Sequence, residues 1–238
     1  MTRGYKRYKV EGFPELEVGA VFSTKYQFGM PFPNDEAFDD TPHSRIGLLG
    51  SSEHSDFLKY RVEFEASKRQ DFRYRNFRDT KFIAISKLVA FQDKRTPYIY
   101  VRGPSKYSDK FLEQLAEVIP EFHAFEREID LRRLVEERPK ITGGWFTNLK
   151  IEKVQTVAIF GPSVSQSEDW SKYEVLGKTS SIVTELQLSG DKVSVQLSRD
   201  GGIAIKTAMS EREDLDALIE IDKVLERYTL RDDVAFTL

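Results

Sequence analysis

The chain has 238 residues, of which 39% are hydrophobic and 12% are aromatic. It contains no cysteine, and its net charge is −3. This length and composition predict a folded protein of one large domain or two small ones, and the lack of thiols excludes a disulfide scaffold, a cysteine-ligated zinc site and a thiol nucleophile. The N-terminus has no apolar run and no stretch approaches the ~20 apolar residues that cross a bilayer, so we expect a cytoplasmic protein without a membrane partner.

The first half of the chain is predicted to be rich in strands. Residues 5–22 predict one or two strands, whereas residues 26–56 contain three Pro and three Gly without a regular period and predict a long loop. Residues 57–65 alternate apolar with polar side chains, as a half-buried strand does. Further short strands are predicted at residues 71–78, 81–85, 87–91 and 97–102, with a turn at Ser86-Lys87.

Two helices are predicted to follow these strands at the end of the first half of the chain. Ser108 is expected to cap the first, and the second is expected to run from Glu121 to Arg138, after the break at Pro120. The segment from Pro139 to Gly144 is the best interior boundary. We therefore expect a β-rich region of residues 1–138, with the two helices, and a second region of residues 139–238, or a single compact domain made of both.

The second half ends in the most regular pattern of the chain. After one or two strands, residues 162–181 predict a polar loop in which Trp170 is exposed, whereas Trp145 is expected to be buried. Apolar residues then alternate along three short strands between residues 181 and 205, and a helix follows. Ser210 and Glu213 have the spacing of a capping box at its start.

Strands followed by a helix therefore occur twice. This order predicts an α+β fold, made mostly of antiparallel sheets that are each covered by an amphipathic helix, rather than a parallel doubly wound sheet. Two similar strand-strand-strand-helix halves are one arrangement that this order allows, although the residues show no internal repeat.

The charge is unevenly distributed along the chain. Residues 55–110 carry 14 basic and 7 acidic residues, a balance of +7, whereas residues 10–54 carry 2 basic and 8 acidic residues, a balance of −6. A basic band between acidic flanks is typical of a polyanion-binding face, and it also arises when two parts of one protein neutralise each other.

The strongest candidate for function lies in this band, in the stretch KRQDFRYRNFRDTK at residues 68–81. Cationic side chains there can neutralise phosphates while aromatic side chains stack on bases, as in sheets that bind single-stranded nucleic acid. The candidate nucleic-acid-binding residues are Arg61, Lys68, Arg69, Arg73, Tyr74, Arg75, Phe77, Arg78 and Lys81.

A purely structural interpretation of the same residues is also open. If the strands predicted at 57–65 and 71–78 pair as a hairpin with their apolar faces matched, Glu63 lies opposite Arg73 and Arg61 opposite Arg75. A slip of two residues would instead pair Glu63 with Arg75. In either register the aromatic residues belong to the core and the arginines to a solvated face. The contact between Arg61 and Arg75 is unfavourable without an anion, which favours binding.

The acidic part of the predicted loop is a second candidate site. Carboxylates and one imidazole can together hold Mg²⁺ or Mn²⁺ and activate a water molecule, although their spacing matches no established metal motif. Solvated turn residues have the same composition. The candidate metal ligands are Asp35, Glu36, Asp39, Asp40 and His43.

A third candidate is the tripeptide Asp79-Thr-Lys81, which has the Asp-x-Lys spacing of one class of metal-dependent nucleases. Asp56 or Asp35 would supply the second carboxylate. The tripeptide is common, and it precedes a predicted strand where the nuclease pattern follows one, so the motif is weak by itself.

Three functional hypotheses follow. The first is a non-enzymatic accessory protein that binds nucleic acid through a basic, aromatic sheet face. The second is a protein–protein interaction module, a homo-oligomer or a subunit of a larger complex, and the third is a metal-dependent nuclease that uses the acidic loop. The sequence contains no GxxxxGK[ST], GxGxxG, HExxH or GxSxG pattern, so a P-loop NTPase, a Rossmann enzyme, a zincin and an α/β-hydrolase are not expected.

Overall fold

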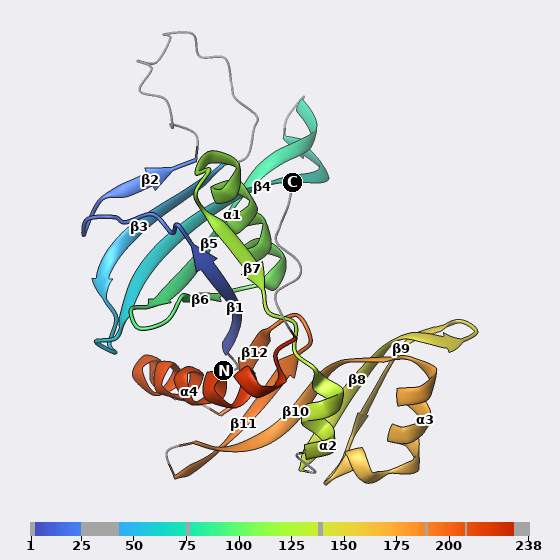
Figure 1. The fold of residues 1–238 in the computed structure, drawn as a ribbon. Helices are drawn as coiled ribbons and strands as arrows, with labels where there is room; N and C mark the ends of the chain where they lie inside the picture. The colour runs from blue at the N-terminus through green and yellow to red at the C-terminus, as the bar shows by residue number, and fades with distance from the viewer. Residues whose placement is uncertain are drawn as a thin grey trace, which may run out of the picture. The chain divides into compact units, whose positions relative to one another are not determined.

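The computed structural model describes residues 3–24, 43–74, 77–137, 140–188, 190–207 and 209–230, and for residues 67–74 and 77–83 it describes the backbone alone. The chain divides into two compact units, Val10–Ala124 and the combination of Met1–Lys9 with Phe125–Thr237, which we call the 10–124 unit and the 125–237 unit. The described part contains twelve antiparallel strands and four α-helices (Figure 1). The predicted α+β class is therefore confirmed, whereas the covering of each sheet by one helix stays a prediction.

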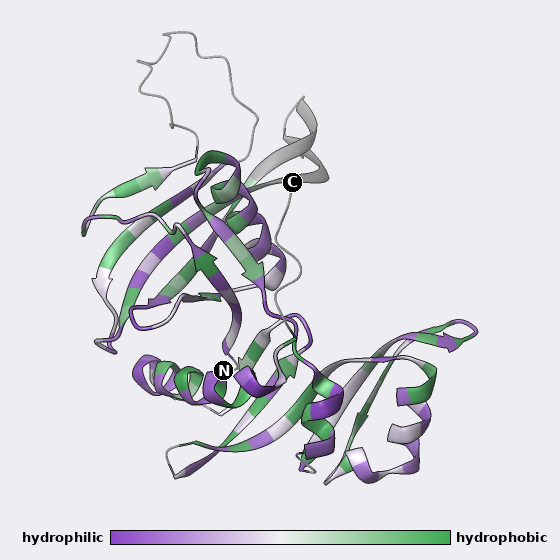
Figure 2. Ribbon diagram, viewed as in Figure 1, coloured by the Kyte–Doolittle hydropathy of each residue, from purple (hydrophilic) through white to green (hydrophobic). Residues whose placement is uncertain are grey.

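The 10–124 unit is built on five neighbouring strands and one helix. Along the sheet the strands are β2 (Val21–Ser23), β3 (Ser44–Ser51), β4 (Phe57–Tyr74), β5 (Phe77–Asp93) and β6 (Tyr98–Arg102), and the helix is α1 (Ser105–Val118). Apolar and polar residues alternate along its strands (Figure 2). Tyr60, Val62 and Phe64 of β4 are buried as the alternation predicts, together with Phe111 and Leu115 of α1.

Three predictions for this unit are wrong. Strand β4 continues from Phe57 to Tyr74, so it joins the strand predicted at 57–65 to the first half of the one predicted at 71–78, whose residues 77 and 78 begin β5. Strand β5 likewise continues through Ser86-Lys87 without a turn. The two strands pair along nearly their whole length, and this ladder outweighs the weak turn preference of Ser-Lys. The predicted loop at 26–56 contains strand β3, whereas residues 25–42 lie outside the described part.

The helical predictions are also corrected. Helix α1 begins at Ser105 after Pro104, whose φ of −65° suits the start of a helix, and Ser108 is a buried residue inside it. The helix predicted from Glu121 is instead strand β7 (His123–Glu126) followed by α2 (Leu131–Glu137). The carboxylate of Asp130 accepts the backbone N–H of Arg133 at 3.1 Å, which explains why α2 begins there.

The 125–237 unit has six neighbouring strands. In order along the sheet they are β1 (Arg3–Glu11), β12 (Gly202–Ile205), β11 (Asp191–Ser198), β10 (Lys178–Leu188), β8 (Ile141–Ile151) and β9 (Val154–Phe160). The remaining elements are η1 (Val164–Gln166), α3 (Glu168–Leu176), α4 (Glu211–Leu225) and η2 (Glu226–Tyr228). The three strands predicted between 181 and 205 are confirmed as β10, β11 and β12. The elements β10-β11-β12-α4 repeat the order β4-β5-β6-α1, and the similarity of the two halves stays a prediction.

Neither tryptophan has the burial that the sequence predicts. Trp170 is 2% exposed and lies on α3, a helix that the Ser-rich composition of this segment concealed, whereas Trp145 is only half-buried. Ser167 accepts the backbone N–H of Trp170 and starts the helix. The ring of Trp170 packs against Phe146 at a centroid distance of 4.9 Å and against the backbone of Gly144.

Replacing Gly144 by Ala is expected to destabilise the protein by about 1–3 kcal/mol, because the added Cβ would lie less than 3.0 Å from the Trp170 ring. Urea unfolding measures this difference. Gly161→Ala is the matched control, since no atom lies within 4 Å of its Cβ position. Equal unfolding midpoints for the two variants would contradict the packing of Trp170 on Gly144.

The capping box of α4 is confirmed. Ser210 Oγ accepts the N–H of Glu213 at 3.2 Å, and Glu213 Oε2 accepts the N–H of Ser210 at 2.6 Å. These hydrogen bonds, above all the one from the Ser210 backbone, hold the pKa of Glu213 below its usual value.

The capping box predicts a pH-dependent stability. Because the folded-state pKa of Glu213 is lowered, its contribution is present above the ordinary carboxyl pKa of about 4.3 and is lost as the pH falls through the lower folded value. Thermal midpoints of the native protein and Glu213→Gln are therefore expected to differ at pH 7, and the difference is expected to shrink as the pH falls below about 4.3. A difference at pH 3 as large as that at pH 7 would argue against the carboxylate as its source.

Among the described residues, no helix is both long enough and apolar enough to cross a bilayer.

Candidate nucleic-acid interface

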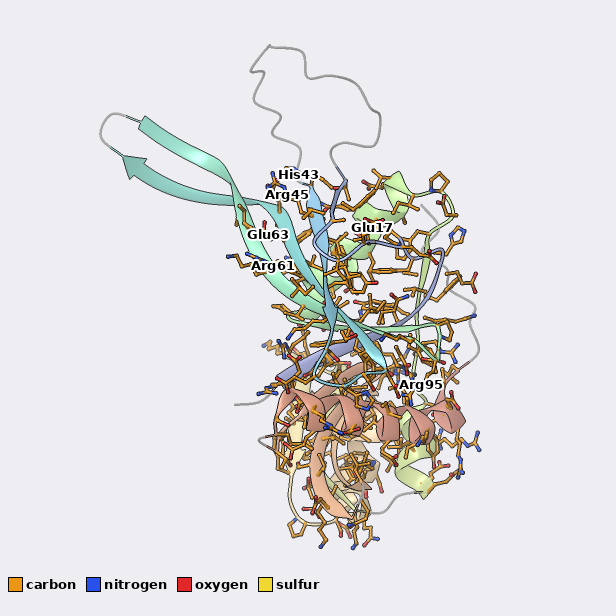
Figure 3. The ribbon with its side chains drawn as sticks, turned by 90° about the vertical axis from the view of Figure 1, so that its left-hand side faces the viewer. Glu17, His43, Arg45, Arg61, Glu63 and Arg95 are labelled. Atoms are coloured by element: carbon orange, nitrogen blue, oxygen red, sulfur yellow. The ribbon has the colours of Figure 1, made fainter. Side chains whose placement is uncertain are left out.

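The longest strand pair of the protein carries the predicted site. Strand β3 pairs with β4 as far as Phe64, and β6 pairs with β5 only over Val89–Gln92. Beyond these points residues 66–74 and 77–84 pair only with each other among the described strands, and we call this part the β4–β5 ribbon. Nine residues at about 3.3 Å each make it about 30 Å long, and it extends away from the other strands of its unit (Figure 3).

The register of the ribbon differs from both predicted registers. Glu63 lies opposite Lys87, and neither Arg73 nor Arg75 is its partner. The last described pair is Tyr74 with Phe77, so the chain does not reverse before Phe72, because β4 and β5 keep their ladder of hydrogen bonds as far as this pair. The basic stretch at 68–81 therefore forms the end of one long hairpin and does not fold back on residues 57–65.

Like charges meet across the ribbon in this register. The backbone position of Arg69 pairs with that of Lys81, and Arg73 pairs with Arg78. Cross-strand pairs of like charge destabilise a hairpin, as opposite charges stabilise it. Residues 68–81 carry six basic and two acidic residues, so the end of the ribbon has a charge of +4.

The structure places the candidate residues as follows. Arg61 lies on β4 before the ribbon, with its side chain 57% exposed and its Nη2 atom 3.4 Å from Glu63 Oε1. Arg75 lies outside the described residues. The others lie on the ribbon, where the backbone alone is described: Lys68, Arg69, Arg73, Tyr74, Phe77, Arg78 and Lys81.

A charged surface continues from the ribbon onto the sheet. Arg45 of β3 lies opposite Glu63, which in turn lies opposite Lys87 of β5, so a basic, an acidic and a basic residue form one row across three strands. Arg45 and Arg61 flank Glu63 (Figure 3). Arg45, Arg61 and Lys87 are exposed, and this face is opposite to the one that buries Val62. We call these four charged residues the β3–β5 surface.

Two residues of this surface are not predicted from the sequence. Arg45 lies in the predicted irregular loop, and Lys87 lies in the predicted turn. Ile46 and Leu48 alternate with Arg45 and Gly47, and this short alternation could have identified the strand around Arg45. The sequence AISKLVAF around Lys87 has no period-2 alternation and contains no such signal. A hollow of about 270 Å³ lies beside Arg45 and Arg61, where Gly47 has no side chain to fill it.

Most of the predicted metal ligands lie outside the described residues, namely Asp35, Glu36, Asp39 and Asp40. His43 is described, and its Nδ1 atom lies 2.8 Å from Glu65 Oε2. Within the described part of the chain no three His, Asp or Glu side chains come together as a metal site would require. Binding of Mg²⁺ or Mn²⁺ by the acidic loop stays a prediction.

The structure does not bring Asp56 to Asp79. Asp56 precedes β4 and forms an ion pair of 2.8 Å with Arg95, whereas Asp79 pairs with Phe72 near the other end of the strand. Fifteen residues of extended chain separate the two positions, which is about 50 Å. A nuclease centre built on Asp79 would therefore need a carboxylate other than Asp56.

Comparison with known proteins adds no relative: no protein-family model matches the chain, and a search of the curated proteins finds no similar sequence.

Proposed function

We propose that the protein binds nucleic acid through the β4–β5 ribbon and acts as a non-enzymatic accessory protein. The observation that carries this proposal is the pairing of Arg69 with Lys81 and of Arg73 with Arg78. These pairs cost stability in the free protein, and phosphate groups placed beside them would remove that cost. The expected contribution of Arg75 follows from the sequence alone.

The form of the ribbon supports a duplex as one of its ligands. The major groove of B-DNA, about 12 Å wide, admits a two-stranded β-ribbon, and a ribbon of about 30 Å would follow it for roughly one helical turn. Single-stranded nucleic acid would instead stack on Tyr74 and Phe77. The β3–β5 surface would extend either contact at the base of the ribbon, through Arg45 and Arg61.

The test is a fluorescence-anisotropy titration with labelled single- and double-stranded DNA and RNA at 50 and 200 mM salt. We expect sub-micromolar binding at 50 mM salt that weakens steeply at 200 mM, since released counterions drive the binding of a basic surface. A duplex that binds more tightly than the single strand would support the groove contact, and the reverse order would support stacking. No binding to any of the four would overturn the proposal.

The same experiment distinguishes the metal-dependent nuclease from the non-enzymatic accessory role. Binding without strand cleavage in 5–10 mM Mg²⁺ or Mn²⁺ supports the accessory role. Cleavage that is lost in Asp39→Ala or Asp40→Ala would replace the accessory role by the metal-dependent nuclease.

A second proposal concerns strand β9, which ends the described sheet of the 125–237 unit. Its seven residues, VQTVAIF, contain no charge, and Phe160 is 61% exposed. Natural edge strands commonly carry charges or proline that prevent pairing with another chain. We propose that β9 pairs antiparallel with β9 of a second copy about Val157, an arrangement that brings no like charges together.

Light scattering after size-exclusion chromatography tests this second proposal. The native chain is expected to be a dimer, and Val157→Lys is expected to be a monomer with an unchanged thermal midpoint. Thr156→Lys adds the same charge on the opposite face of β9. It is the comparison variant for effects that come from the packing of one face of the strand. A native chain that is monomeric at 100 µM would overturn the proposal.

A further inference from the structure

A large, partly open cavity lies within the 125–237 unit. Its volume is about 970 Å³, and it is bordered by β8, β10, β11 and the segment that contains Glu126 and Glu128. Pockets for small molecules commonly measure about 300–1,000 Å³. Among the described residues that border it, all carry a polar or charged side chain except Leu230.

Irregular pairing of the strands accompanies this cavity. The register of β8 with β10 shifts between Thr179 and Ser181, and the register of β8 with β9 shifts between Thr147 and Ile151. Asn148, inside the second irregularity, has a φ of 54°, a left-handed conformation that asparagine tolerates better than most residues. Bulges of this kind redirect side chains and are common beside binding sites.

One wall of the cavity presents polar groups without a protein partner. Lys178 lies directly opposite Thr147 in the ladder, and Asn148 follows Thr147 in the chain. Within the described residues none of these three side chains makes a hydrogen bond or an ion pair. An ammonium, a hydroxyl and an amide are hydrogen-bond donors, and together they suit a phosphate group.

The other wall presents acceptors and a second cation. Glu128 Oε1 lies 3.6 Å from Arg199 Nε, and Asp200 accepts the hydroxyl of Ser198. Lys6 Nζ lies 3.6 Å from Asp200 Oδ2 and offsets its charge. Carboxylates in such a wall accept hydrogen bonds from the hydroxyl groups of a ligand.

We propose that this cavity binds a small phosphorylated, hydroxyl-rich molecule of the sugar-phosphate class. The phosphate lies at Lys178, Thr147 and Asn148, and the hydroxyl groups lie at Glu128 and Asp200. No aromatic side chain is among the described residues that line the cavity, so it offers no platform on which a nucleobase would stack. The proposal is independent of nucleic-acid binding, because the β4–β5 ribbon belongs to the other unit.

Isothermal titration calorimetry of the full chain tests this proposal, with ribose 5-phosphate and glucose 6-phosphate as probes. Ribose, inorganic phosphate and AMP are the comparison ligands. We expect at least one sugar phosphate to bind with a dissociation constant below 1 mM, and at least tenfold more tightly than ribose or inorganic phosphate.

Two variants locate the site. Lys178→Met is expected to weaken sugar-phosphate binding at least tenfold, whereas Lys192→Met, at an exposed position of β11 outside the cavity, is expected to leave it unchanged. Glu128→Gln is expected to weaken binding of the sugar phosphate without changing that of inorganic phosphate. Thermal midpoints equal to that of the native chain show that each variant is folded.

Three outcomes would overturn the proposal. They are the absence of sugar-phosphate binding at 10 mM, equal binding by the Lys178→Met and Lys192→Met variants, and tighter binding of AMP than of either sugar phosphate.

Discussion

Reversing the charge of the facing pair Arg73 and Arg78, in the variant Arg73→Glu/Arg78→Glu, is expected to weaken nucleic-acid binding about 100-fold at 50 mM salt. A factor of 100 is about 2.8 kcal/mol, or about 1.4 kcal/mol for each arginine, which is at the low end for a hydrogen bond to a charged group. The two residues occupy directly opposite backbone positions on β4 and β5. Fluorescence anisotropy at several salt concentrations measures the change, and the slope of log K against log salt is expected to fall by about 2.

A control variant with the same change of net charge distinguishes loss of a binding site from a general effect of net charge on affinity. The variant Lys150→Glu/Lys192→Glu changes the charge by the same −4 and affects exposed residues of the 125–237 unit. It is expected to lower affinity less than threefold. If both variants lose the same affinity, binding depends on overall charge and the ribbon is not the site.

The stability of the protein without nucleic acid provides a second test of the pairing of Arg73 with Arg78. Because the like charges at Arg73 and Arg78 destabilise the hairpin, an Arg73→Glu variant, which creates an opposite-charge pair, is expected to stabilise it by about 0.2–1 kcal/mol. Chemical unfolding without nucleic acid measures this effect. Loss of binding together with unchanged or higher stability excludes unfolding as the reason for the loss.

Removing the carboxylate of Asp222 is expected to destabilise the protein by about 3–5 kcal/mol, the largest effect on stability that we expect from one side chain. Arg7 is fully buried, and its Nη1 atom lies 2.5 Å from Asp222 Oδ1, while Nη2 lies 3.3 Å from Thr229 Oγ1. In Asp222→Ala the buried guanidinium loses the carboxylate of this ion pair. Urea unfolding at pH 7 measures the loss.

The double variant Arg7→Met/Asp222→Leu shows whether an unpaired charge causes that loss. Apolar residues of similar volume replace buried ion pairs at little cost, so we expect most of the stability to return. The exposed pair of Arg132 with Glu136 on α2 is the comparison, and Glu136→Ala there is expected to cost less than about 1 kcal/mol. A similar small loss for Asp222→Ala would contradict the buried pair.

The spacing of this ion pair and its neighbour explains why β1 and α4 fit together. Arg3 and Arg7 are four residues apart on a strand, about 13 Å, and Asp214 and Asp222 are eight residues apart on a helix, about 12 Å. Arg3 Nη1 accordingly lies 2.7 Å from Asp214 Oδ2, and this hydrogen bond raises the pKa of Arg3. Tyr5 donates its hydroxyl to the same carboxylate at 2.8 Å.

Much of the candidate interface was accessible from the sequence as a list of residues, but its geometry was not. The run of basic residues at 68–81 is visible in the sequence because charge is a property of composition, and it lies at the end of the ribbon. The pairing of Arg73 with Arg78 depends on where the chain reverses, and Glu63 lies opposite Lys87 instead of opposite Arg73 or Arg75 as the predicted registers required. Arg45 was missed because its strand lies inside a segment rich in Gly and Pro.

The sequence by itself determined those features that depend on neighbouring residues: the alternation along β4 and β10–β12, the capping box at Ser210, and the α+β class. Only the tertiary structure decided the register of the long hairpin, the burial of Trp170 on Gly144 and the partner of Arg7. The physical reason is the separation along the chain of the residues that interact. A period in the sequence indicates which face of an element is buried, whereas the partner of a polar or aromatic side chain lies many residues away and is selected by packing of the whole unit.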